Sequence, residues 1–141
     1  MSIQAVLLPL FVQVLLTFVL LVWMANLRTS AITGGAVSPS DIALREPGWP
    51  AQATQVANAF HNQLELPVLF YVLTILAWIT RHADYLFVVM AWIFVALRLA
   101  HSFVHTTGNV VARRGAVFIA GAIVLALMWL IFMLRILLGL G

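Results

Sequence analysis

Four long apolar runs divide the chain, with charged side chains mostly gathered between them. About 20 apolar residues span the hydrocarbon core of a bilayer, so each run predicts a transmembrane helix. The predicted spans are about 3–27, 51–80, 85–112 and 116–138. The pattern therefore predicts an all-α integral membrane protein. We expect one up-down-up-down four-helix bundle that occupies the whole chain, 1–141.

The connections between the runs differ greatly in length. Residues 28–50 form a long polar loop interrupted by glycines and prolines. Arg81–Asp84 predicts a tight turn, and Arg113–Gly115 predicts another. Pro67 lies inside the second run and predicts a kink just after Glu65.

The first run has a second interpretation, as a cleavable signal peptide. No basic residue precedes the run, and it is longer than the apolar region of such a peptide. We therefore expect it to stay in the protein as a helix.

Composition restricts the class of protein further. The chain is 65% hydrophobic and 8% charged, and its mean hydropathy is +1.13. A soluble domain is about a quarter charged, so lipid must be the main solvent. The net charge of +3 comes from scattered arginines without a basic cluster, which argues against a nucleic-acid partner. Cysteine is absent, so disulfides and thiolate ligands are excluded.

The arginines that flank the spans predict the orientation. Four of them fall on one side of the membrane and two on the other, namely Arg28, Arg45, Arg113 and Arg114 against Arg81 and Arg135. By the positive-inside rule, the first and third loops are cytoplasmic and both termini lie on the non-cytoplasmic side. We expect a multi-pass protein, with a bacterial inner membrane as its location.

A polar stripe runs along the second span. Asn58, His61, Asn62 and Glu65 fall within an arc of about 100° on a helical wheel. Polar groups inside a membrane span are expensive to desolvate and mark a functional site by default.

The third span carries a matching stripe. It consists of Arg98, His101, Ser102, His105 and Asn109. If the cytoplasmic ends of the two spans are level, the facing pairs are Glu65–Arg98, Asn62–His101, His61–Ser102 and Asn58–His105. We therefore predict a cleft open to the cytoplasm, with Glu65 and Arg98 paired at its floor and with Arg28, Arg113 and Arg114 around it.

Each of these features also has a purely structural interpretation. The Glu65–Arg98 pair and the two asparagines can simply hold helices together. The spacing of His101 and His105 also suits a metal pair or a haem, although no second acidic shell accompanies it and we predict no metal site. Adjacent arginines are often topology signals alone.

The motifs resemble those of the MAPEG family, which contains the microsomal glutathione transferases and the membrane leukotriene and prostaglandin synthases. The second-helix pattern Asn-x-x-Glu followed by proline is matched by Asn62, Glu65 and Pro67. The third-helix pattern begins at Arg98, continues with His101 and His105, and is followed by Arg113 or Arg114. The similarity covers most of the chain, and this chain resembles a divergent bacterial-type member.

The resemblance implies a homotrimer of four-helix subunits that binds glutathione between neighbouring subunits. Arg113 or Arg114 would stabilise the glutathione thiolate. The implied contacts to glutathione are Arg28, Asn58, His61, Asn62, Glu65, Arg98, His101 and His105.

Three positions differ from the family pattern: Asn58 stands where an arginine is usual, Leu66 where an aromatic residue can occur, and His105 where a tyrosine is usual. Two hypotheses follow. The first is a glutathione-dependent transferase or peroxidase of lipophilic electrophiles. The second is a non-catalytic MAPEG-like protein that binds lipid or serves as a subunit of a larger membrane complex.

Overall fold

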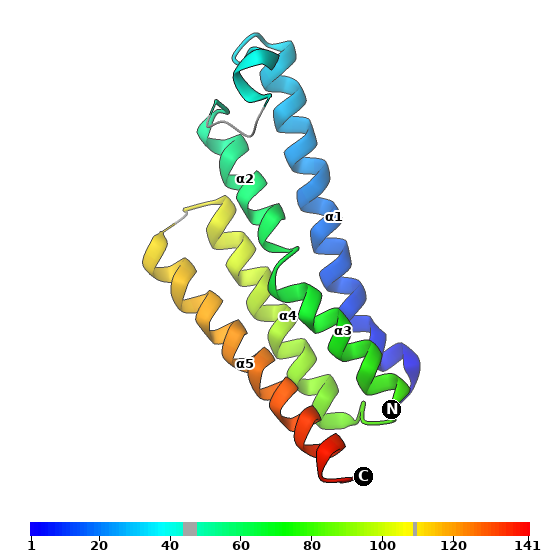
Figure 1. Cartoon of the computed structure of the whole chain (residues 1–141). Helices are drawn as coiled ribbons and strands as arrows, with labels where there is room; N and C mark the ends of the chain where they lie inside the picture. The colour runs from blue at the N-terminus through cyan, green and yellow to red at the C-terminus, as the bar shows by residue number, and fades with distance from the viewer. Residues whose placement is uncertain (44–47, 109) are drawn as a thin grey trace.

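The protein is a bundle of long helices, described here from a computed structural model that covers residues 1–43, 48–108 and 110–141 (Figure 1). The helices are α1 (Ile3–Thr33), η1 (Pro39–Ile42), α2 (Ala51–Asn62), α3 (Leu66–Ile79), α4 (Tyr85–Thr106) and α5 (Val111–Leu137). Over these residues there is no β-strand. Arg45 and Asn109, which entered the predictions of orientation and of the second stripe, lie outside the described residues.

Four helical segments are long and apolar enough to cross a membrane, with α2 and α3 together forming one of them, Ala51–Ile79. The all-helical fold and the four predicted spans are therefore confirmed. Many large apolar side chains on the outer faces are exposed, including Phe11, Leu15, Ile75 and Ile123. Lipid-facing surfaces require such side chains.

The first helix is longer than predicted. It continues through Arg28 to Thr33, because no glycine or proline interrupts residues 28–33. It ends at Gly34, whose N–H donates to the Ser30 carbonyl at 2.9 Å. The expected boundary at residue 28 was wrong, and Arg28 is a helical residue.

The second span is broken rather than kinked. Gln63–Glu65 forms a turn between α2 and α3, in which the N–H of Leu64 donates to the His61 carbonyl at 3.0 Å. Pro67 lies in the first turn of α3. Backbone N–H groups in a first turn have no partner within the helix, so the missing N–H of proline costs no helical hydrogen bond. The predicted disturbance is confirmed, but it begins two residues before the predicted position.

The connection between the last two spans also differs from the prediction. Helix α4 ends at Thr106, and α5 already begins at Val111. Arg113 and Arg114 were expected in a turn but lie in the first turn of α5, where the Arg114 N–H donates to the Val110 carbonyl at 2.9 Å. The two helices are joined instead through the segment that contains Gly108.

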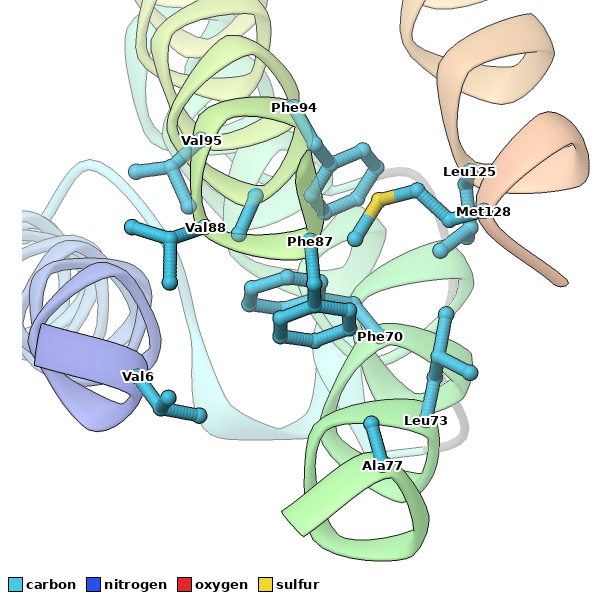
Figure 2. Close-up of a cluster of buried hydrophobic side chains, with 11 residues drawn as sticks. Val6, Phe70, Leu73, Ala77, Phe87, Val88, Phe94, Val95, Leu125 and Met128 are labelled. Carbon is cyan, nitrogen blue, oxygen red and sulfur yellow. The ribbon is translucent and has the colours of Figure 1, made fainter. Parts of the chain in front are cut away.

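The main apolar core lies at the end of the bundle where both termini are found (Figures 1 and 2). Side chains from four helices meet there: Val6 of α1, Phe70, Leu73 and Ala77 of α3, Phe87, Val88, Ala91, Phe94 and Val95 of α4, and Leu125 and Met128 of α5. The rings of Phe70 and Phe94 pack with centroids 4.9 Å apart. This core holds α3, α4 and α5 in position below the polar residues.

Candidate ligand-binding cleft

A polar cleft of about 500 Å³ opens beside α2, α4 and α5. Its walls are Asn58, His61, Asn62 and Glu65 from the second span, His101 and His105 from α4, and Arg114, Gly115 and Phe118 from α5. The whole stripe of the second span thus lines one cavity together with His101 and His105 of the stripe on α4, whereas Arg98 and Ser102 do not line it. Asn58 and Glu65 are exposed, whereas His101 and His105 are buried.

Arg98 lies beneath this cleft, with only 1% of its surface exposed. Its Nη2 donates to the side-chain oxygen of Asn62, to the Asn62 carbonyl at 3.3 Å and to Gln63 Oε1 at 3.3 Å. A buried guanidinium needs such acceptors because its charge cannot be desolvated without compensation.

The predicted direct pair of Glu65 and Arg98 is wrong, because these two side chains form no ion pair within 4.0 Å. Asn62 stands between them, since its Nδ2 donates to Glu65 Oε1 at 3.2 Å. The break at Gln63–Glu65 explains the difference. It ends the regular helix before Glu65 and leaves that carboxylate exposed at the wall of the cleft.

Sequence reasoning missed Gln63, which is completely buried and joins three helices. Its Nε2 donates to Ser102 Oγ at 3.1 Å and to the Ala59 carbonyl at 2.8 Å. Its Oε1 accepts from Gln13 Nε2 of α1 at 2.8 Å.

The predicted pairing of His61 with Ser102 is therefore wrong, and Gln63 takes that place. His61 instead contacts the carbonyl of Ala57 through Nδ1 at 2.7 Å. One signal in the sequence pointed to Gln63: Gln13 is another uncharged polar residue within an apolar span, and it needs a buried partner.

The two histidines of α4 stack edge to face at the wall of the cleft, with ring centroids 5.4 Å apart. The Nδ1 atom of each is buried and has no hydrogen-bond partner within the described chain. These two nitrogens are therefore buried polar atoms without a protein partner beside the cleft. No group of three His, Cys, Asp or Glu with metal-binding geometry occurs within the part of the chain that the structure describes.

The predicted arginines do not all reach this cleft. Arg114 lines it, whereas Arg113 points outward from the same turn of α5 and is exposed. Arg28 lies on α1 with its guanidinium carbon 5.0 Å from the centroid of the Trp49 ring. Arg28 does not line the cleft.

The model of the MAPEG family matches residues 6–134. The chain belongs to the MAPEG family. The match includes all the cleft residues and all or most of each of the four spans, so this MAPEG protein is an integral membrane protein. No curated protein and no solved structure matches the chain.

Proposed function

We propose that this MAPEG protein is a glutathione-dependent transferase or peroxidase that acts on lipophilic electrophiles dissolved in the membrane. The observation that carries the proposal is the convergence of both polar stripes and Arg114 on one open cleft. Its volume of about 500 Å³ lies within the usual range of small-molecule sites.

The chemistry of the wall suits glutathione, which carries an ammonium group, two carboxylates, two amides and a thiol. Glu65 offers a carboxylate for the ammonium group, and Asn58 and Asn62 offer carboxamides for the peptide groups. The imidazoles of His101 and His105 line the same cleft and are of a type that can hydrogen-bond a carboxylate or an amide. The Glu65 side chain is positioned for this by its hydrogen bond to Asn62.

Arg114 is the residue that we assign to the thiol. A nearby guanidinium favours the thiolate, which is the nucleophilic form of the group. In a transferase reaction the thiolate sulfur bonds to an electrophilic carbon, and the leaving group departs with its electron pair. In the peroxidase reaction two glutathione molecules are oxidised to the disulfide while the peroxide is reduced to an alcohol and water.

We further propose that the four spans run up-down-up-down and that three subunits assemble around the glutathione sites. Arg28 supports this arrangement, because it lies on α1 outside the cleft of its own subunit. In a trimer it would be available to a neighbouring cleft. The cleft would face the cytoplasm, both termini the other side, and membrane lipid would surround the bundle.

A second candidate is a non-catalytic member that binds a lipid or joins a larger membrane complex. Asn58 favours it, because a neutral carboxamide lines the cleft where the family usually has an arginine. Such a protein would bind its ligand without activating a thiol.

Thermal unfolding of the detergent-purified protein with and without millimolar glutathione tests the proposal. At 100 times the dissociation constant, the ligand should stabilise the fold by about 2.7 kcal/mol. Conjugation of glutathione to an activated chloronitroarene should accompany this shift. Binding without conjugation would favour the second candidate, and the absence of both would refute the glutathione proposal.

Arg114→Ala should lower the conjugation rate about 100-fold, which is the usual effect of losing one preorganised group that stabilises an anion. Arg113→Ala is the matched control, because it removes the same charge from the adjacent, outward-facing position. We expect it to retain most of the activity. Equal losses in both variants would contradict the assignment of Arg114.

A further inference from the structure

The turn that joins α3 to α4, at the opposite end from the cleft, holds a strained arginine. Arg81 has a φ of 62°, and no other described non-glycine residue has a positive φ. The N–H of His82 donates to the Ala77 carbonyl at 2.8 Å, and the N–H of Arg81 donates to the Trp78 carbonyl at 3.1 Å. This is the Schellman arrangement that ends many helices, and glycine is the usual residue at its left-handed position.

An arginine at that position costs backbone energy that glycine or asparagine would avoid. A strained residue that persists is grounds for a functional hypothesis. The helix end itself does not need the guanidinium, because both hydrogen bonds that close the turn are made by the backbone.

Among the described residues, no acidic side chain pairs with Arg81. Asp84, the acid nearest in sequence, pairs with Arg135 through an Nη1–Oδ2 distance of 2.8 Å and also accepts from the Phe87 N–H. Within the described residues, Arg81 forms no ion pair. Its guanidinium is exposed and available to an external anion.

A hollow of about 540 Å³ lies next to this guanidinium. The hollow is lined by Met1, Trp78, Ile79, Arg81 and Ala83. Trp78 is 38% exposed and Ile79 is 68% exposed. A cation and an interfacial tryptophan beside an exposed aliphatic side chain match the polar and apolar parts of a phospholipid.

We propose that this hollow binds the phosphate headgroup of an anionic phospholipid, with Arg81 as its cation and with the acyl chains along the apolar surface of α3. A free phosphate ion shares the headgroup chemistry. The lipid is favoured because the apolar side of the hollow contributes nothing to the binding of a small, hydrated anion.

Native mass spectrometry of the detergent-released protein, titrated with phosphatidylglycerol or phosphatidylcholine, tests this proposal. The wild type should retain phosphatidylglycerol more tightly than phosphatidylcholine. Arg81→Asn should weaken the retention of phosphatidylglycerol about fivefold, which corresponds to the loss of one basic residue at a membrane surface. Asparagine tolerates the left-handed conformation, so this variant should fold at least as well as the wild type.

Two controls complete the experiment. Arg81→Lys keeps the charge at the same backbone position and should retain the preference. Arg113→Gln removes an equal charge from α5 at the other end of the bundle and should leave the preference unchanged.

Equal retention of the two lipids by the wild type would overturn the proposal, as would equal losses in Arg81→Asn and Arg113→Gln. Displacement of phosphatidylglycerol by millimolar inorganic phosphate would also overturn it, because the site would then recognise the free ion. None of these results depends on whether glutathione binds in the cleft.

Discussion

The two halves of the bundle are held together by different kinds of contact. In the half that contains the termini, Phe70, Phe94 and their neighbours form the main apolar core (Figure 2). In the other half, Gln63 and Arg98 link the helices through directed hydrogen bonds. Apolar packing fixes the distance between helices, whereas the hydrogen bonds fix which side chains face the cleft.

The boundary between the halves is the break in the second span. Residues Gln63–Glu65 leave the helical path there, which places Gln63 inside the bundle and Glu65 at the wall of the cleft. A continuous helix would also separate the side chains of Gln63 and Glu65, by about 200° on its wheel, and would keep Asn62 and Glu65 on one face. The irregular backbone lies in the polar half, whereas the apolar half is built from regular helices.

The largest loss in the free energy of unfolding should come from a substitution in the apolar half. Phe70→Ala removes a fully buried ring from its contact with Phe94 and should lower the free energy of unfolding by about 3 kcal/mol. Leu69→Ala changes a neighbouring, exposed side chain of α3 and should have a much smaller effect. Denaturation of both variants in mixed detergent micelles measures the difference.

The same variants test whether the halves are separate. Stabilisation by glutathione should be unchanged in Phe70→Ala, because this residue does not line the cleft. If glutathione no longer stabilised Phe70→Ala, the two halves would be energetically coupled and the comparison would fail.

Substitutions in the buried pair of Gln13 and Gln63 should lower the free energy of unfolding by a smaller amount. Gln63→Leu should cost about 2 kcal/mol, because it leaves several buried polar groups without a partner, and Gln13→Leu should cost about 1 kcal/mol. A double-mutant cycle should give a coupling energy of about 1 kcal/mol, as for other hydrogen bonds between membrane helices. A coupling near zero would show that the 2.8 Å bond between them does not stabilise the bundle.

Glutathione binding separates the roles of the two residues. Gln63→Leu should weaken it, because Gln63 contacts both Arg98 and Ser102 beneath the cleft. Gln13→Leu should leave it nearly unchanged, since Gln13 reaches the site only through Gln63. Equal losses in both variants would indicate that α1 takes a direct part in positioning the site.

Hydropathy alone predicted the four spans, because the need to bury the backbone in lipid permits few alternatives to a helix. Helical periodicity also predicted that the stripe from Asn58 to Glu65 and the stripe on α4 share a cleft, and the cavity is lined by the first stripe and by His101 and His105 of the second. Both predictions use a repeating pattern over many residues. A shift of one or two residues changes little in such a pattern.

The individual pairings were harder to predict. The expected contacts of Glu65 with Arg98 and of His61 with Ser102 assumed an unbroken helix, and the turn at Gln63–Glu65 changes the register of the two spans. The position of Arg114 depended in the same way on where α5 begins. A few local hydrogen bonds decide where a helix ends, so the apolar pattern predicts the position of a helix end only to within several residues.

The smallest loss in the free energy of unfolding should follow removal of the ion pair that links the end of α5 to the start of α4. The Arg135–Asp84 distance is 2.8 Å, but the two side chains are 23% and 47% exposed. Asp84→Asn should therefore lower the free energy of unfolding by only about 0.5 kcal/mol, and salt should reduce that difference.

Asparagine keeps the N-cap that Asp84 makes with the Phe87 N–H, so the variant isolates the charge. Arg135→Gln should show a similar loss, and the double variant should lose little more than either single variant. Glutathione binding at the far end should not respond to any of the three. A loss above about 2 kcal/mol in Asp84→Asn would exceed the range of exposed pairs and would show that the terminal half also depends on a charge contact.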